Sequence, residues 1–222
     1  MISVAIDGPA GAGKSTLSRK LAEKFGFIYV DTGALYRAVG LKFSLSGADT
    51  DLNCDIEGIL ADTTVDIRFV NGEQRVFLDG KDVSDDIRTP KASMMASAVS
   101  AKPAVRAFLL DTQRELAKSN DCLMDGRDIG TVVLPNATVK VYLTASAEDR
   151  AMRRYKELIE KGQTVEYKDV YEDMVQRDYN DMHREIAPLK QADDAVVADT
   201  TGLEFEESFE LLTNIIKKGI EA

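Results

Sequence analysis

The sequence predicts an α/β fold in which helices cover both faces of a five-stranded parallel sheet. Five short apolar runs alternate along the chain with long segments of helical periodicity. A glycine-rich turn joins the first apolar run to the first helical segment. Alternation of this kind favours a parallel sheet, because each crossover helix packs back onto one of its faces.

The five apolar runs are the candidate core strands, at residues 2–6, 27–30, 122–125, 139–143 and 195–198. The helical segments occupy residues 14–25, 33–46, 103–118, 147–161, 168–184 and 204–218. Cap-type side chains at Ser146 and at Asp31-Thr32 stand where two of these helices begin. Gly26 and Gly219 follow two other helices and indicate their C-terminal ends.

One segment departs from the alternation and reads as strand, turn, strand, turn. The two turns are marked by Asn71-Gly72 and Asp79-Gly80, dipeptides that are typical of tight hairpin turns. We therefore expect a small antiparallel sheet at residues 63–86 that stands off the parallel core.

Composition limits the class of protein. The chain has 222 residues, which suits one large domain, and its 28 Lys and Arg face 38 Asp and Glu, a net charge of −10. Without a basic tract, sequence-independent binding of nucleic acid is not expected. The two cysteines lack CxxC spacing, the start shows no secretion signal, and no apolar run approaches the ~20 residues that span a bilayer. We expect a cytoplasmic protein with neither a nucleic-acid nor a membrane partner.

Residues 8–15 read Gly-Pro-Ala-Gly-Ala-Gly-Lys-Ser, directly after the first strand and before the first helix. In such a loop the backbone N–H groups and the helix N-terminus face a phosphate. Lys14 would reach the β- and γ-phosphates, and the Ser15 hydroxyl would bind Mg²⁺. A chance glycine turn is the alternative, but the flanking strand and helix favour a nucleoside triphosphate site.

Charged side chains follow two other strands. Arg37 lies one turn into the second helix, where it is either a phosphate ligand or a solvated side chain. Arg127 and Asp128 follow the strand at 122–125, at the sheet edge where open α/β sheets bind their ligands. They could supply a cationic fork and an acceptor there, or form a solvated ion pair in a loop.

Two helices carry arginines at helical spacing. Arg150, Arg153 and Arg154 stand at i, i+3 and i+4, which places them on one face, where an anion or nearby acidic residues must offset their repulsion. In the next helix, Arg177, Asp181 and Arg184 form a second stripe. A plain charged surface remains the alternative for the first group.

A triphosphate loop, several separate arginine sites and few nucleophile–base pairs together predict phosphoryl transfer to an acceptor that itself carries phosphate. A small GTPase-like switch is one alternative, but its Asn/Thr-Lys-x-Asp string does not occur. The second alternative is a kinase for another acceptor, such as shikimate, a nucleoside or UMP. If the acceptor carried no phosphate, the arginines beyond the loop would have no common ligand.

In these motifs the chain resembles the bacterial cytidylate kinases, which are nucleoside monophosphate kinases. The resemblance rests on IDGPAGAGKST, DTGALYR, GRDIGTVVLP and RDYNDMHREIAPLKQADDAVVADTT and spans most of residues 2–202. It implies one P-loop kinase domain, built from a core, a monophosphate-binding flap that holds the β insert, and a short helical lid. The core is at 1–32, 99–149 and 166–222, the flap at 33–98, and the lid at about 150–165.

The resemblance also implies roles for single residues. The residues implied to read cytosine are Ser97, Arg106 and Asp128. Those near the ribose are Thr32, Arg177 and Asp181, and those that clamp the monophosphate are Arg37, Arg127 and Arg184. Lys14 and the lid arginines Arg150, Arg153 and Arg154 are implied to act on the transferred phosphoryl group.

The implied nucleotides are ATP as donor and CMP or dCMP as acceptor. The ATP-binding residues are Gly8, Pro9, Ala10, Gly11, Ala12, Gly13, Lys14, Ser15 and Thr16. Mg²⁺ is expected at Ser15, and Asp125 either holds a metal-bound water or caps the core. A monomer is expected, because no long exposed apolar pattern is evident.

Overall fold

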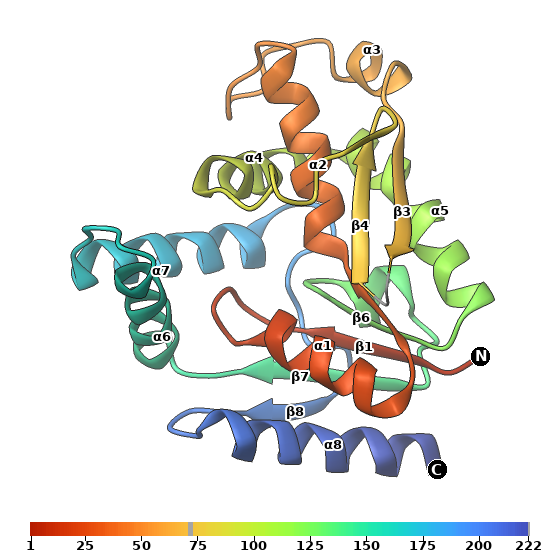
Figure 1. Ribbon diagram of the computed structural model, residues 1–222, viewed down its shortest axis with the longest axis vertical. Helices are drawn as coiled ribbons and strands as arrows, with labels where there is room; N and C mark the ends of the chain where they lie inside the picture. Colours follow the sequence, from red (N-terminus) through yellow and green to blue (C-terminus); the bar gives the residue numbers. More distant parts are fainter. Residues whose placement is uncertain (71–72, 222) are drawn as a thin grey trace.

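The computed structural model has a central sheet of five strands: β1 Ser3–Asp7, β2 Ile28–Asp31, β6 Cys122–Gly126, β7 Val139–Thr144 and β8 Val196–Asp199. They are all parallel and lie in the order β2-β6-β1-β7-β8 (Figure 1). The structure describes residues 1–70 and 73–221. The predicted five-stranded parallel sheet is confirmed, and each strand lies within two residues of its predicted position.

The helices are α1 Lys14–Phe25, α2 Thr32–Leu45, α3 Ile56–Ala61, α4 Pro90–Ser100, α5 Pro103–Ser119, the π-helix η1 Ile129–Val133, α6 Ala147–Glu160, α7 Tyr167–His183 and α8 Phe205–Glu221. Helices α1 and α8 cover one face of the sheet, where Val4 and Ile6 of β1 are buried. On the other face, Ala5 packs with residues of η1 and α5. This alternation along β1 is what a strand buried on both faces requires.

Predicted helix ends are correct at Ser146, Asp31 and Gly26, but wrong at Gly219. The Ser146 hydroxyl accepts from Asp149 N at 3.2 Å, and the Asp31 carboxylate accepts from the third residue of its helix at 3.0 Å. Helix α8 continues through Gly219 to Glu221. A Cβ at Gly219 would lie 2.7 Å from Val139, so this glycine permits close packing of α8 on β7.

Helices α3 and α4 were not predicted from the sequence. Helix α4 begins with Thr89, whose hydroxyl accepts from Ala92 N at 3.1 Å, and with Pro90 in its first turn. It packs tightly on α2, because a Cβ at Gly40 would lie 2.9 Å from the Met95 side chain. Together α2, α4 and the insert enclose a second hydrophobic core.

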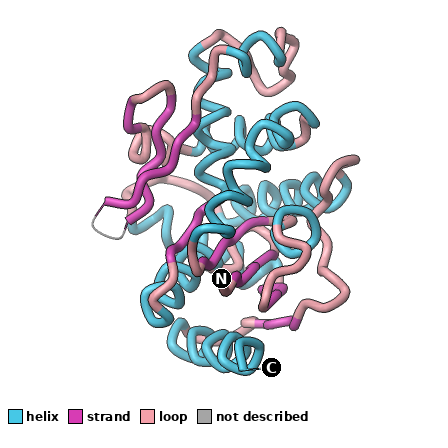
Figure 2. Tube along the Cα trace, turned by 90° about the vertical axis from the view of Figure 1, so that its right-hand side faces the viewer, coloured by secondary structure: helices cyan, strands magenta, loops and turns pink. Residues whose placement is uncertain are grey.

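The predicted insert is a separate antiparallel sheet of β3 Val65–Val70, β4 Glu73–Leu78 and β5 Lys81–Asp82 (Figures 1 and 2). Asp79 and Gly80 have positive φ angles of 50° and 81°, as the predicted turn requires. The predicted turn at Asn71-Gly72 lies outside the described residues. The insert does not stand free of the core, because Asp31 N donates to the Gln74 side chain at 2.8 Å. None of the described helices combines the length and apolar character needed to cross a membrane.

Candidate active site

The loop between β1 and α1 has the backbone of a phosphate cradle. Gly8 lies so close to β7 that a Cβ there would come within 1.9 Å of the Leu143 carbonyl oxygen. Gly11 and Gly13 adopt positive φ angles of 73° and 83°, a region that favours glycine. Helix α1 begins directly after this loop, so its N-terminal amides and dipole face whatever the loop holds.

The Lys14 ammonium lies inside this loop. Its Nζ donates to the carbonyl oxygens of Gly8 and Pro9, each at 2.7 Å. Burial, together with the positive charges of Arg127 and Arg177, lowers the pKa of Lys14 well below its usual value. A phosphate in the loop would supply a counter-charge to this buried ammonium.

Ser15 and Asp125 meet at the sheet edge beside the loop. The Ser15 hydroxyl donates to Asp125 Oδ2 at 3.0 Å, and the Tyr29 hydroxyl donates to Oδ1 at 3.0 Å. Burial and the nearby Asp31 carboxylate raise the pKa of Asp125 to about 6. Thr32 Oγ1 donates to the main-chain oxygen of Asp125 at 2.7 Å, which ties α2 to the end of β6.

Hydroxyl and carboxylate oxygens are the ligands that Mg²⁺ prefers, so the Ser15–Asp125 pair fits this ion. Within residues 1–70 and 73–221, no three His, Cys, Asp or Glu side chains form a metal cage. A Mg²⁺ ion at this pair would therefore take most of its ligands from phosphate oxygens and water.

Three arginines gather near Lys14: Arg127 and Arg177 act directly on its charge, and Arg37 lies near Arg177. Arg127 Nε donates to Asp181 Oδ2 at 2.8 Å, and Arg37 Nη2 donates to Asp31 Oδ2 at 2.8 Å. The buried Nε atoms of Arg37 and Arg177 have no hydrogen-bond partner among the described residues. Burial and the charges of Arg127 and Arg37 lower the pKa of Arg177. This cluster would gain most from an anion of more than one negative charge.

A second polar cluster forms around Asp128. Its carboxylate pairs with Arg106, and Arg184 Nη2 approaches Asp128 Oδ1 at 3.3 Å. Both arginines also reach Ser100: Arg106 through the Ser100 carbonyl at 3.2 Å and Arg184 through the hydroxyl at 3.4 Å. The hydroxyl of Ser100 donates to the carbonyl of Ser97 at 2.9 Å, so Ser97 borders the same cluster. Arg184 thus contacts Asp128, one of the implied base readers, and its implied place in the monophosphate clamp stays a prediction.

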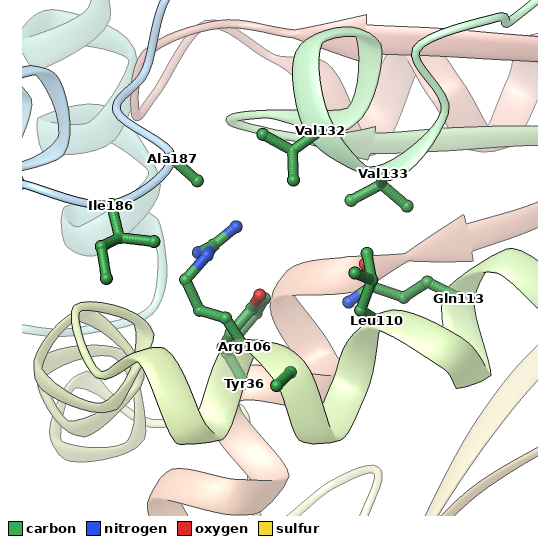
Figure 3. A pocket seen from close by; sticks show the side chains of 9 residues that line it. Tyr36, Arg106, Leu110, Gln113, Val132, Val133, Ile186 and Ala187 are labelled. Carbon is green, nitrogen blue, oxygen red and sulfur yellow. The ribbon is translucent and has the colours of Figure 1, made fainter.

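A cavity of about 290 Å³ opens beside Arg106 (Figure 3). Its walls are mostly apolar and come from α2, α5, η1 and the segment after α7: Tyr36, Arg106, Ala107, Leu110, Gln113, Val132, Val133, Ile186 and Ala187. The Arg106 guanidinium lies 5.5 Å from the centre of the Tyr36 ring. Apolar walls with a few directed polar groups suit a flat heterocyclic ligand.

The three arginines of α6 have separate partners and do not converge on one point. Arg150 is buried, and its Nη1 donates to Asp178 at 2.6 Å and to the Ala10 carbonyl at 2.8 Å. Arg153 Nη2 donates to the Thr200 carbonyl at 2.8 Å. Arg154 pairs with Glu157 one turn away at 2.8 Å. Each guanidinium therefore has a different acceptor within reach, and joint action of the three on a transferred group stays a prediction.

Sequence reasoning missed two buried carboxylates of this site. Asp178 Oδ1 accepts from the Ala10 N–H of the phosphate loop at 3.3 Å. Asp7, which immediately precedes Gly8, accepts from the backbone of η1. Asp178 neighbours Arg177 in the sequence, and an acidic residue on the buried face of a helix is a signal that could have found it.

Comparison with known proteins gives a consistent result. A family model described as cytidylate kinase matches residues 4–218. A cytidylate kinase of Caldicellulosiruptor bescii is 50% identical over 220 residues, which cover 99% of this chain and 97% of that protein. A cytidylate kinase of Lactobacillus johnsonii is 47% identical over 218 residues, 98% of this chain and 95% of that protein. A gluconokinase structure from Sinorhizobium meliloti has a TM-score of 0.51 at 14% identity, covering 99% of this chain and 94% of that one, and shares the fold.

Proposed function

Because this chain belongs to the cytidylate kinase family, we propose that it transfers the γ-phosphoryl group of ATP to CMP and dCMP. The products are ADP and CDP or dCDP. The observation that carries the proposal is the buried guanidinium of Arg177. It lies near Arg37, Arg127 and Lys14, with its Nε unpaired among the described residues.

The arginine cluster suits the phosphate of the acceptor. A nucleoside monophosphate carries close to two negative charges at pH 7, since its second pKa is about 6. Arg37 and Arg127, which the resemblance implies for this role, would hold these charges and fix the attacking oxygen in line with the donor. We add Arg177 to them, although the resemblance implies a place near the ribose for it, because its guanidinium lies near both. Because that oxygen is already ionised, the transfer requires no protein base.

The Asp128 cluster suits the base. Cytosine presents an amino donor beside two acceptors, which match a carboxylate and a guanidinium placed side by side as in Asp128 and Arg106. Uracil has a carbonyl where cytosine has the amine, so its oxygen would face the carboxylate without a donor. That mismatch costs on the order of 1–3 kcal/mol, and we expect cytidine nucleotides to be favoured.

The donor site uses the loop, Lys14 and the Ser15–Asp125 pair. The loop glycines let backbone amides approach the phosphates, and Lys14 exchanges its loop carbonyls for phosphate oxygens. Ser15 and Asp125 would hold Mg²⁺ directly or through water. When bound, the ion offsets charge on the transferring group. Arg150 is placed to do the same from α6, since it already contacts the loop at Ala10.

We also propose the division into core, flap and lid. The apolar residues of the flap, residues 33–98, form a hydrophobic core that continues onto α5 through Val105 and Leu109. The lid, residues 150–165, holds most of α6 and the loop that follows. Closure of both over the nucleotides would exclude water that otherwise hydrolyses ATP. A cytoplasmic monomer completes the proposal, and light scattering on the purified chain tests the monomer.

The test is ADP formation from MgATP with CMP, dCMP, UMP, AMP, GMP, dTMP and shikimate as separate acceptors. We expect strong turnover with CMP and dCMP, and weak or no turnover with the others. Turnover confined to another acceptor would overturn the base assignment while keeping the phosphate loop. No turnover with any acceptor would overturn the proposed transfer itself.

A further inference from the structure

Asp7 connects the phosphate loop to the segment that carries Asp128. It is the last residue of β1, directly before Gly8, and its side chain is buried with 4% of the residue exposed. Oδ1 accepts from Ile129 N at 2.7 Å, and Oδ2 accepts from Gly130 N at 2.7 Å. The two oxygens of one carboxylate thus bind the first two amides of η1, the residues directly after Asp128.

The arrangement requires a carboxylate rather than an amide. Two consecutive N–H groups point at Asp7, and only an ionised side chain offers each of them an oxygen. In an asparagine, the NH₂ group would face one of these donors and leave it buried without an acceptor. Negative charge at the first turn of η1 is also favoured by the orientation of its peptide dipoles.

The helix that Asp7 binds, η1, fixes the backbone of Asp128. Its carbonyl accepts from Val132 N at 2.9 Å and Val133 N at 3.2 Å, so η1 holds this residue from its C-terminal side. Asp7 in turn holds η1 at Ile129 and Gly130. A π-helix is a rare conformation that concentrates at functional sites, and here it follows the implied base reader directly.

Gly130 lies where a larger residue would press on this anchor. A Cβ at Gly130 would lie 3.3 Å from Asp7 Oδ2 and 3.2 Å from Cδ of Lys140. The Lys140 ammonium is held at 2.8 Å by Asp194, so this side chain is fixed at its far end. Any side chain at residue 130 would therefore press on both Asp7 and Lys140, so glycine here lets η1 approach the end of β1 closely.

We propose that Asp7 is a positioning residue for selection of the base: through η1, it holds the Asp128 carboxylate where it accepts from the cytosine amine. The inference rests on the proposed function of Asp128 and adds a residue that touches neither nucleotide. It also means that one side chain at the end of β1 positions the acceptor site, while the next residue, Gly8, begins the donor site.

The experiment compares kcat/KM for CMP and for UMP in the full chain and in Asp7→Asn. We expect the CMP/UMP ratio to fall about tenfold, because Asp128 loses its fixed position, while KM for ATP changes less than KM for CMP. Ile216→Ala, in the core between α8 and the sheet, is the control for loss of stability alone. A merely structural role of Asp7 would lower activity on CMP and UMP equally, as expected for Ile216→Ala.

Two further variants keep the outcome decisive. Gly130→Ala retains the carboxylate but pushes on the same anchor, and the CMP/UMP ratio is expected to fall there also, even if Asp7→Asn fails to fold. Asp128→Asn tests the proposed reader itself. If Asp128→Asn lowers the ratio and the Asp7 and Gly130 variants leave it unchanged, the positioning role is wrong and the base assignment stands. If Asp128→Asn leaves the ratio unchanged, both the base assignment and the positioning role are wrong.

Discussion

Asp178 on α7 and Arg150 on α6 form a buried ion pair of 2.6 Å that closes around Ala10 of the phosphate loop. Asp178 accepts from the Ala10 N–H at 3.3 Å, and Arg150 donates to the Ala10 carbonyl at 2.8 Å. Both backbone groups of one loop residue are therefore bound by side chains from two helices. The position of the phosphate loop at Ala10 therefore depends on the positions of α6 and α7.

The Asp178→Asn variant should weaken ATP binding. The amide oxygen can still accept from Ala10, but Arg150 is left buried without a counter-charge. We expect KM for ATP to rise about tenfold and the free energy of unfolding to fall by about 3 kcal/mol. Initial rates at varied ATP and urea unfolding measure the two effects. Asp173→Asn, at an exposed position of the same helix, is the control. Equal KM for ATP in the two variants would contradict this role.

Removing Lys14 should abolish transfer and leave the fold intact. Its ammonium is buried next to Arg127 and Arg177, so Lys14→Ala removes repulsion as well as two hydrogen bonds to loop carbonyls. We expect kcat to fall by about a thousandfold or more, with a melting temperature equal to or above that of the unchanged chain. Lys20→Ala, at an exposed site of α1, should keep full activity. Substantial turnover by Lys14→Ala would rule out the assigned role.

Arg177→Ala should separate acceptor binding from stability. This guanidinium is buried with an unpaired Nε, so its removal relieves repulsion with Arg127 and Arg37. We expect KM for CMP to rise by about tenfold or more, while the thermal midpoint stays constant or rises. Arg68→Ala, on the exposed insert, provides the comparison. A large loss of stability with KM for CMP unchanged would show that Arg177 is structural.

The free energy of unfolding should depend on pH through the titration of Asp7. Burial raises the pKa of Asp7 from 3.8 to about 6, although the Gly130 and Ile129 amides oppose the shift; Asp128 adds to it and Lys14 reduces it. Between about pH 4 and pH 6 the native carboxyl keeps a proton that the unfolded chain loses. Its contribution to the free energy of unfolding therefore falls as pH rises through this window, by on the order of 3 kcal/mol.

Asp7→Asn does not titrate, so the difference in unfolding free energy between the unchanged chain and this variant isolates the Asp7 contribution. Urea unfolding of both proteins at pH 4.5 and pH 7.5 measures that difference. We expect the unchanged chain to be relatively more stable than the variant at pH 4.5 than at pH 7.5. The same difference at both pH values would contradict a raised pKa.

Much of the fold could be predicted from the sequence because its signals are local. Strand-forming apolar runs, helical periodicity and the glycine loop each occupy a few consecutive residues, and the structure confirms the sheet they predict. Helix α4 was not predicted although Thr89 and Pro90 mark its start, because its many small Ala and Ser residues give only a weak contrast between a polar and an apolar face. Gly219 was misread because a helix end and close packing of a helix on a strand both favour glycine.

The partners within the site could not be predicted, because they join distant parts of the chain. Asp178 reaches a loop 168 residues away, and Asp7 reaches η1 across 122 residues. Helical spacing placed Arg150, Arg153 and Arg154 on one face but could not show that each has its own acceptor. Spacing along one helix reports which side chains are neighbours, whereas the tertiary fold decides what each of them contacts.

Competition between CMP and UMP tests the central claim most directly. The purified chain is mixed with MgATP and equal concentrations of the two acceptors, and CDP and UDP are quantified over time. The structure around Arg106 and Asp128 predicts that CDP forms first and that UDP accumulates only after most CMP is consumed. Formation of CDP and UDP at equal rates would contradict the assignment of this cluster as the reader of cytosine.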